Sequence, residues 1–197
     1  LKYSADKLRI MNNLSDDLHS IEITAMRLFL ELAKDINIGV LDPRKISKQM
    51  SFEKPFFDER MILQKIHAED NLYSFILNLA PQTIDYKNLL SEYQRLRSIS
   101  KSKSWGNRVP EDITLGFNLS HPNVLYLRSR LHRMGYIPFN NGSELFDSEL
   151  RSAVQLFQSD FGLNDDGVAG KFTLKAVNVS SEMRLVQVLV NLERARW

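Results

Sequence analysis

The sequence predicts an all-α protein of two units, with minor β structure at most. Apolar residues recur at the spacing of an α-helix through most of the 197 residues. This spacing is lost between Ser100 and Pro122, in a stretch rich in Ser, Gly, Pro and Asn, which is typical of a connector. A chain of this length with 43% hydrophobic residues supports either one large core or two small ones, and the connector favours two.

The first unit is predicted to be a helical bundle over residues 14–104. Its first long helix ends at Gly39, where a left-handed residue stops the turn, and Pro43 suits the first turn of a short helix. Two more helices are expected, separated near residues 69–71. The last helix, which ends near Ser98, carries an apolar stripe on one face: Leu89, Leu90, Tyr93, Leu96 and Ile99.

A connector over residues 105–117, with one or two short extended pieces, leads to the second unit over residues 118–179. Three short helices are expected there, and they share one small core. Gly135 ends the first of them. The second begins at a residue that caps its free amides, either Asp147 or Ser148.

A further helix is expected from about Ser181, within residues 180–197. It is too apolar for a helix surrounded by water, so we expect it to pack on the first unit. The residues behind this expectation are Leu185, Val186, Val188, Leu189, Val190 and Leu192.

Composition and charge exclude several kinds of function. Lys and Arg number 26 and Asp and Glu 24, so the net charge of +2 gives no field that favours nucleic acid, and no nucleic-acid partner is expected. No apolar run approaches the roughly 20 residues that span a bilayer, so no transmembrane segment is expected, and the first residues lack the pattern of a signal peptide. The absence of Cys excludes disulfides, thiolate metal ligands and a Cys nucleophile.

Other polar residues give no sign of catalysis, of a metal or of a cofactor. The four His residues are scattered, and His67 has no second His at the spacing of a zinc site. Paired carboxylates such as Asp165 and Asp166 lie in predicted turns, where solvation and capping explain them without glycosidase chemistry. We therefore expect no catalytic residue, no metal and no cofactor in this chain.

The second unit contains a series of residues in a characteristic order. A Gly-Tyr pair follows the first helix, Ala-Val-x-x-Phe-Gln lies in the second, Gly-Leu ends it, and Asp-Gly-x-x-Gly and Thr come next; the residues are Gly135, Tyr136, Ala153, Val154, Phe157, Gln158, Gly162, Leu163, Asp166, Gly167, Gly170 and Thr173. This series resembles the peptidoglycan-binding domain of the type-one superfamily. The resemblance implies a small three-helix peptidoglycan-binding domain.

Motifs on either side of the second unit extend the resemblance. A Gly-x-x-Asp-Pro turn lies at residues 39–43, Trp105 stands in the connector, and residues 191–197 read Asn-x-Glu-Arg-x-Arg-Trp. These segments resemble the large L,D-transpeptidases that carry a helical scaffold. In that family a catalytic domain follows, and its Cys thiolate attacks a peptide carbonyl with His as the base.

The resemblance and the absence of Cys together define the expected function. The chain is expected to be the peptidoglycan-binding and helical scaffold portion of a cell-wall L,D-transpeptidase, and not itself an enzyme. Its expected partners are peptidoglycan, through the stem peptide or the glycan, and its own missing catalytic domain, in the periplasm or cell envelope. Two alternatives are a purely structural domain pair that positions a catalytic partner and an accessory domain of a cell-wall hydrolase.

Candidate ligand-binding residues follow from the chemistry of peptidoglycan. Stem-peptide carboxylates, amides and N-acetyl sugars require an aromatic face and amide donors and acceptors. In an alternative interpretation the aromatic candidates fill the edge of the core, Gln158 caps a loop and Asn164 occupies a left-handed turn. The candidates are Tyr136, Phe146, Gln158, Asn164 and Asp165.

Two further groups of residues are given structural interpretations. The loop from Asp166 to Gly170 is expected to be mainly structural, with both of its glycines in backbone conformations that other residues resist. Three arginines of the helix before Gly135 either meet ligand carboxylates or lie on a solvated helix face, and the solvated face is favoured: Arg128, Arg130 and Arg133.

Overall fold

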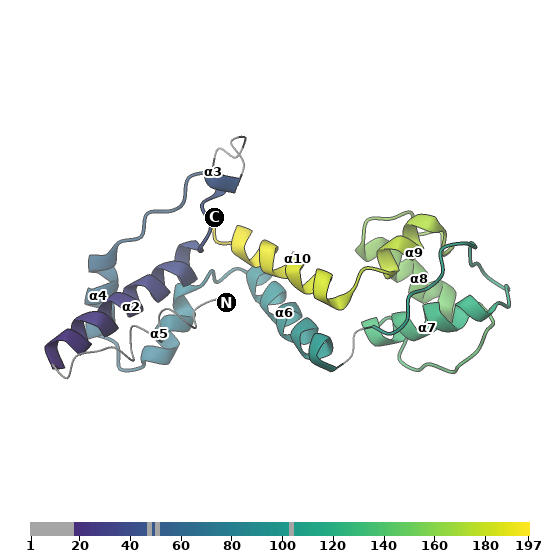
Figure 1. Cartoon of the computed structure of the whole chain (residues 1–197), viewed down its shortest axis with the longest axis horizontal. Coiled ribbons are helices and arrows are strands. Elements are labelled where there is room, and N and C mark those ends of the chain that lie inside the picture. The colour runs from purple at the N-terminus through teal and green to yellow at the C-terminus, as the bar shows by residue number, and fades with distance from the viewer. Residues whose placement is uncertain (1–17, 47–48, 50–51, 103–104) are drawn as a thin grey trace. The chain divides into compact units, whose positions relative to one another are not determined.

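The computed structural model describes residues 18–46, 49, 52–102 and 105–197. Within these residues the β structure is limited to two isolated antiparallel bridges, Leu115 with Ala169 and Ser120 with Leu145. The all-α class is therefore confirmed. The helices of the described residues are α2 (Leu18–Ile38), α3 (Pro43–Ile46), α4 (Glu59–His67), α5 (Leu72–Leu79), α6 (Ile84–Ser102), α7 (Pro122–Met134), α8 (Ser148–Asp160), α9 (Lys171–Val177) and α10 (Ser181–Arg194) (Figure 1).

The chain divides into two compact units. Unit 1 consists of residues 1–90 and 189–197, and unit 2 of residues 91–188. Unit 1 is therefore built from both ends of the chain, and the sequence of unit 2 is inserted between them. The finer domain boundaries inferred from the sequence stay predictions.

The helix ends show how local sequence sets the elements. Gly39 and Gly135 follow α2 and α7 with left-handed φ angles of +79° and +96°, and the Asp147 side chain caps α8 by accepting a hydrogen bond from the Leu150 amide at 2.9 Å. These three predictions are confirmed. The end predicted for α6 near Ser98 is wrong, since the helix continues to Ser102. The stretch contains no Gly or Pro, and Ser and Lys weaken a helix only slightly.

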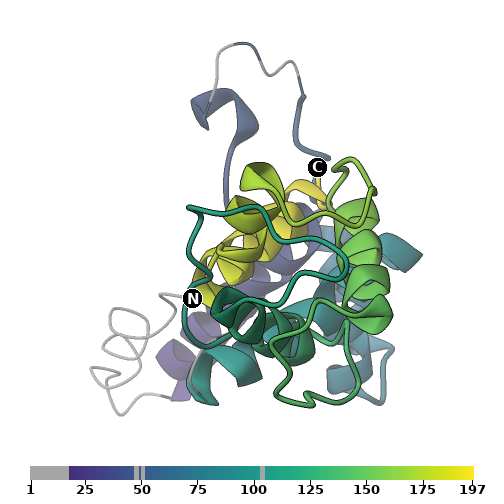
Figure 2. The ribbon, with the colours of Figure 1, turned by 90° about the vertical axis from the view of Figure 1, so that its right-hand side faces the viewer.

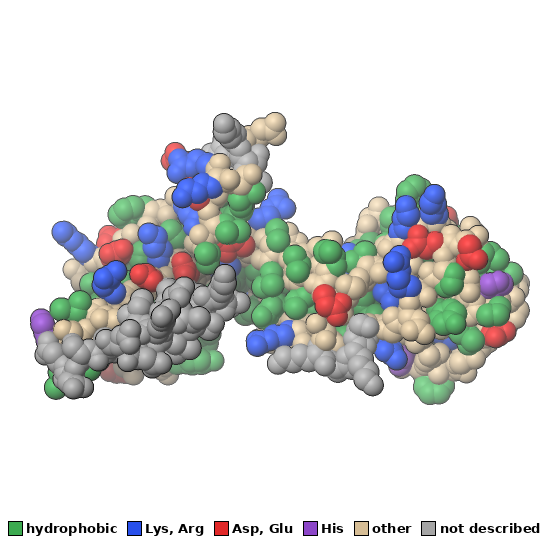
Figure 3. Space-filling model, in the orientation of Figure 1, with side chains coloured by type: hydrophobic (Ala, Val, Ile, Leu, Met, Phe, Trp, Pro, Cys, Tyr) green, Lys and Arg blue, Asp and Glu red, His purple; other side chains and the backbone are tan. Residues whose placement is uncertain are grey.

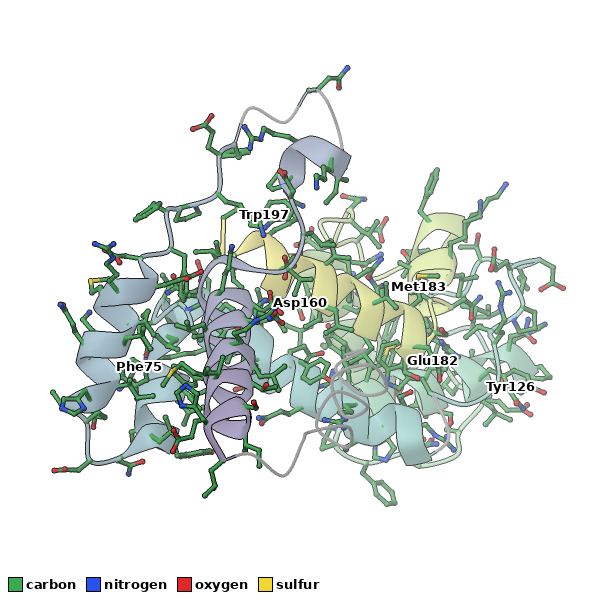
Figure 4. The ribbon with its side chains drawn as sticks, turned by 60° about the vertical axis from the view of Figure 1, so that its left-hand side comes forward. Phe75, Tyr126, Asp160, Glu182, Met183 and Trp197 are labelled. Atoms are coloured by element: carbon green, nitrogen blue, oxygen red, sulfur yellow. The ribbon has the colours of Figure 1, made fainter. Side chains whose placement is uncertain are left out.

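Unit 1 is organised around the contact of α2 with α5. The rings of Phe29 and Phe75 are stacked with their centroids 6.4 Å apart, and Phe75 lies among the helices of this unit in Figure 4. The Asn37 side chain donates a hydrogen bond of 2.8 Å to the carbonyl oxygen of Leu79, at the end of α5. The buried cluster of this unit is small: Ala33, Ile62, Phe75 and Leu79.

The last residues of the chain anchor to the end of α2 in unit 1. The Leu41 amide donates to Glu193 Oε1 at 2.6 Å, and a β-carbon at Gly39 would lie 2.5 Å from the same oxygen. Arg196 donates from Nε to the Ile36 carbonyl at 3.0 Å and from Nη2 to the Tyr86 hydroxyl oxygen at 2.7 Å. The Gly-x-x-Asp-Pro turn and the Glu-Arg-x-Arg segment, far apart in sequence, thus meet in space.

The prediction that α10 buries its apolar side chains is largely wrong. Leu192 is buried, but Val186 and Val190 are 52% and 51% exposed and Leu189 is 42% exposed. Met183, in the first turn of α10 (Figure 4), is exposed as well, and hydrophobic side chains gather over α10 in Figure 3. The physical reason is that the contacts with α2 and the turn after it are made by Glu193, in the last turn of α10, and by Arg196, which follows α10, so the earlier turns of the helix are not held there.

Unit 2 packs α7 against both α8 and α9. The three helices lie together in Figure 1, and the segment before α7 crosses in front of them in Figure 2. That segment is more than a connector, because Val109 and Leu115 are 1% and 0% exposed and belong to the core. The buried core residues are Val109, Leu115, Val124, Leu127, Leu131, Ile137, Phe146, Leu150, Ala153, Val154, Phe157, Ala169, Leu174 and Val177.

Within unit 2, two polar side chains hold the segment before α7 next to the end of α9. Arg130 donates to the carbonyl oxygens of Gly106 at 3.0 Å and Val177 at 2.8 Å. The Asn178 side chain pairs with the backbone of Val109, accepting from its amide at 2.9 Å and donating to its carbonyl at 2.8 Å. The segments that enter and leave the domain are therefore held side by side.

Candidate functional site

The loop between α8 and α9 is organised by the buried side chain of Gln158. Its Oε1 accepts from the Gly167 amide at 2.9 Å, and its Nε2 lies within hydrogen-bond distance of Asp166 Oδ1 at 3.0 Å, Val168 O at 3.0 Å and Thr173 Oγ1 at 3.1 Å. The Gln158 side chain therefore provides hydrogen-bond partners for backbone and side-chain groups along the whole turn. This geometry corresponds to the alternative in which Gln158 caps a loop.

Asp166 completes the loop from its exposed side. Its carboxylate accepts from the Val168 amide at 2.9 Å and from the Asn164 side chain at 3.0 Å. The hydrogen bonds from the Val168 amide and the Gln158 side chain lower the pKa of Asp166, because they stabilise its charged form. The expected structural role of this residue is borne out by these contacts.

Gly167 and Gly170, the two glycines of the loop, differ in backbone conformation. Gly167 has a left-handed φ of +73°, and a β-carbon there would lie 2.8 Å from Arg151 Cγ and 3.0 Å from Gln155 Cγ. The prediction is therefore confirmed for Gly167. It is wrong for Gly170, which caps α9 with a φ of −82° and has open space around the position of a β-carbon, because an extended conformation at an N-cap does not require glycine.

Two of the three arginines of α7 are buried, so the prediction of a solvated face is wrong for them. Arg128 is fully buried, and its Nη2 donates to Asp147 Oδ2 at 2.7 Å and to the Leu145 carbonyl at 2.9 Å. Arg130 is 3% exposed and donates to the carbonyl oxygens of Gly106 and Val177. Both bind protein acceptors and are not available to a ligand, whereas Arg133 is exposed.

Two of the five candidate ligand residues lie beneath the surface. Phe146 is fully buried in the core of unit 2, and Gln158 is 1% exposed. Neither offers surface to a ligand in this conformation, although Gln158 shapes the loop above it. The sequence alternative for Phe146, a residue that fills the core, matches this position.

Tyr136 lies at the other end of α8 from the capping residue Asp147. Its hydroxyl donates to Asp160 Oδ2 at 2.7 Å, and its ring meets the edge of Phe157 with centroids 5.4 Å apart; Asp160 is labelled in Figure 4. Burial and the hydrogen bond to Asp160 raise the pKa of Tyr136. Its hydroxyl is thus already engaged, and the half-buried ring is its remaining surface.

Asn164 and Asp165 are exposed on the loop after α8. Asn164 does not adopt a left-handed conformation, since Asn118 is the non-glycine residue with a positive φ in the described part of the chain. The carbonyl oxygen of Asp165 accepts a long hydrogen bond of 3.4 Å from the Gln155 side chain. Of the five candidates, the structure brings Gln158, Asn164 and Asp165 together around this loop, and places Tyr136 and Phe146 elsewhere.

The sequence interpretation missed three residues next to this loop. The Arg151 guanidinium lies over the ring of Phe117, with its Cζ 5.6 Å from the ring centroid, and Phe117 is 49% exposed. Gln155 lies one helical turn after Arg151 on the same face of α8. We call Phe117, Arg151, Gln155 and Asp165 the Arg151 surface. The available signal was the pair of polar residues four positions apart on the outer face of a predicted helix.

The described residues contain neither a metal site nor a membrane span. Within residues 18–46, 49, 52–102 and 105–197, no group of three or more His, Cys, Asp or Glu residues has the arrangement of a metal site. No helix in the same residues is both long enough and apolar enough to cross a bilayer.

Comparison with known proteins identifies both parts of the chain. Residues 120–177 match the family model of a putative peptidoglycan binding domain. Residues 2–92 match the model of a scaffold domain. The chain contains a peptidoglycan-binding domain and a scaffold domain. The peptidoglycan-binding domain lies within unit 2 and includes α7, α8 and α9.

One curated protein is also similar. The General secretion pathway protein A of Aeromonas hydrophila is 33% identical over 117 residues, which cover 54% of this chain. The chain spans 21% of the length of that protein.

Proposed function

We propose that this chain is the peptidoglycan-binding and scaffold portion of an envelope-associated L,D-transpeptidase. The observation that carries the proposal is the presence of a scaffold domain and a peptidoglycan-binding domain in one chain, in that order. The contact of Glu193 with the turn at residues 39–43 supports it, because the two motifs that resemble the transpeptidase family form one structural unit.

Catalysis in this proposal belongs to a separate domain. The chain has no Cys, so a thiolate that attacks the peptide carbonyl has to come from a catalytic domain of the whole protein. The scaffold and the peptidoglycan-binding domain then position that catalytic domain on its substrate. We propose the catalytic domain as the second partner of this chain, beside peptidoglycan.

The binding part of the proposal is tested by co-sedimentation with purified sacculi. We expect the chain to move into the pellet and to be released by soluble muropeptides. Affinity should be modest, with dissociation constants in the high micromolar to millimolar range, about 4 to 6 kcal/mol of binding free energy, because the exposed surface around the α8–α9 loop buries little of a ligand. A chain that stays in the supernatant at all sacculus concentrations contradicts the function and favours a purely structural domain pair.

The same incubation separates the proposal from that of a hydrolase. Release of soluble muropeptides by the chain alone would show cell-wall cleavage, which the proposal excludes for this chain. The transpeptidase assignment itself is tested by the complete gene. A catalytic domain with a Cys nucleophile and a His base supports it, and its absence from the encoded protein contradicts it.

A second candidate function is that of an envelope module in a secretion apparatus. The observation in its favour is the similarity to General secretion pathway protein A, whose 117 aligned residues exceed the length of the match at residues 120–177. Both candidates require peptidoglycan binding, so the sacculus experiment supports both. The other domains encoded in the same gene distinguish the two candidate functions.

A further inference from the structure

Arg151 differs from other arginines of the peptidoglycan-binding domain in having no protein acceptor among the described residues. Arg128 is bonded to Asp147 at 2.7 Å, and Arg130 to backbone carbonyls. Arg151 is exposed, and its guanidinium forms no hydrogen bond or ion pair with any side chain or carbonyl of the described chain. Five N–H donors in a planar fork are thus free to bind an anion.

The Arg151 side chain is nevertheless held in position. The ring of Phe117 lies under the guanidinium, and its attraction for a cation limits the orientations of the side chain. On the other side, Gly167 lets the stem of Arg151 lie against the loop, since a β-carbon there would meet Arg151 Cγ at 2.8 Å and Nε at 3.3 Å. A donor group that is already oriented loses less conformational entropy when it binds a ligand.

The groups beside Arg151 are ones that can bind peptide amides and ammonium groups. Gln155 donates a long hydrogen bond from Nε2 to the Asp165 carbonyl at 3.4 Å, which leaves its Oε1 and its second N–H for a ligand amide. The exposed carboxylate of Asp165 complements an ammonium group. The Arg151 surface therefore offers an aromatic face, a cation, a carboxamide and an anion next to one another.

We infer that the Arg151 surface binds a free carboxylate of the peptidoglycan stem peptide, with Arg151 as the bidentate donor, Gln155 on the peptide amide and Asp165 toward a peptide ammonium. The inference rests on the proposed function. The glycan does not explain the surface equally well. Its N-acetyl sugars are neutral, and the lactyl carboxyl of a sugar that carries a peptide is consumed in the amide bond. Free carboxylates come with the stem peptide, and an exposed guanidinium fork is suited to them.

The protein side of the inference is tested with Arg151→Gln. Titration of the full chain with a soluble disaccharide-tetrapeptide, followed by chemical shifts, is expected to give a dissociation constant about tenfold weaker for this variant, as loss of a charge-assisted hydrogen bond predicts. The control is Arg97→Gln, which makes the same change at an exposed arginine of α6 and should bind as the unaltered chain does. Thermal melting of both variants checks that the domain is folded.

A second experiment changes the ligand and uses the unaltered chain, so its result does not depend on the folding of any variant. The same muropeptide with its peptide carboxylates amidated should bind about tenfold more weakly than the free acid. Equal binding of the amidated ligand, or an Arg151→Gln variant that binds within twofold of the unaltered chain, overturns the inference while retention on sacculi still supports the proposed function. An unaltered chain that is not retained on sacculi overturns both.

Discussion

The cores of the two units differ in size and in how completely they are covered. The buried cluster of unit 2 contains fourteen described residues, none more than 2% exposed, whereas that of unit 1 contains four, with Phe75 and Leu79 at 8%. Both units leave some large apolar side chains in water, among them Phe56 at 89% exposed in unit 1 and Phe172 at 78% in unit 2. The difference teaches that unit 2 obtains more of its stability from apolar packing than unit 1 does, while both units also use specific polar anchors.

The largest expected effect comes from truncating the centre of the larger core. Phe157→Ala removes a fully buried ring that contacts Tyr136 and Phe161, and should cost about 3 to 5 kcal/mol of the free energy of unfolding of unit 2. Phe75→Ala in unit 1 should cost about 3 kcal/mol or less, because its site is less enclosed and collapses more easily. Denaturant unfolding followed residue by residue by NMR measures both. Equal costs would remove the contrast between the units.

The second prediction tests the buried ion pair of unit 2. Asp147→Asn leaves Arg128 buried without its charged partner, and should cost about 3 kcal/mol at neutral pH, the low end for a broken buried pair because Asp147 is partly exposed. Differential scanning calorimetry of the two proteins measures the loss. A variant as stable as the unaltered chain would mean that the Leu145 carbonyl and Glu149, whose Oε2 lies 3.8 Å from Arg128 Nη1, suffice for Arg128.

The third prediction concerns the stability of unit 2 in acid. Burial of Asp147 favours its neutral form, but the hydrogen bonds from the Leu150 amide and from Arg128 outweigh burial and lower its pKa; the pKa of Asp166 is lowered as well. A lowered pKa gives stability that is present above the unfolded value of about 3.9 and is lost as the pH falls through the folded value. Unit 2 should therefore lose stability below about pH 4, and Asp147→Asn should show a shallower loss. Melting temperatures between pH 2 and 7 provide the measurement, and a parallel pH dependence in the two proteins would contradict the assignment.

The fourth prediction compares the two glycines of the α8–α9 loop. Gly167→Ala should destabilise unit 2 by about 1 to 3 kcal/mol, since it combines a left-handed φ with a close approach to Arg151. Gly170→Ser should be neutral or stabilising by a few tenths of a kcal/mol, because serine caps a helix from this conformation. Paired thermal denaturation of the two variants checks the difference, and a costly Gly170→Ser would show a constraint that the backbone angles do not reveal.

The smallest loss of stability is expected for the anchor of unit 1. Arg196→Gln removes the hydrogen bonds to the Ile36 carbonyl and the Tyr86 hydroxyl, and should cost about 1 to 2 kcal/mol in unit 1 while leaving unit 2 unchanged. Amide hydrogen exchange near the end of α2 should become faster. Arg194→Gln, at an exposed position two residues earlier, is the matched control. Faster exchange in both variants would mean that the charge of the segment matters and not the particular contact.

Most of the fold could be predicted from the sequence because it depends on local signals. The apolar period and residues such as Gly39, Gly135 and Asp147 determine where helices begin and end, and they act within one or two turns. The burial of Arg128 and Arg130 could not be predicted in this way. Their acceptors, such as the carbonyls of Leu145 and Val177, lie 17 and 47 residues further along the chain.

The candidate site was predicted less well than the fold. Gln158, Asp166 and Gly167, in their sequence order, indicated the correct loop. These residues stabilise the conformation of the loop, so they do not indicate which side chains surround it. Arg151 and Phe117 meet only because the bridge between Leu115 and Ala169 brings the segment before α7 next to the loop. Such a pairing has no local signal. Phe117 lies in the turn closed by the Leu119 amide and the Gly116 carbonyl, Arg151 lies on the outer face of α8, and nothing in either segment indicates the other.

The hydrogen bonds of Arg130 and Asn178 determine how the domain responds to mechanical load. The segments at Gly106 and Val177 leave the domain side by side, so tension applied through the chain separates these two segments first. The hydrogen bonds of Arg130 and Asn178 would then break one after another, before the force acted on the helical core. Tension along the chain would thus break these polar contacts before it unfolded the three-helix core.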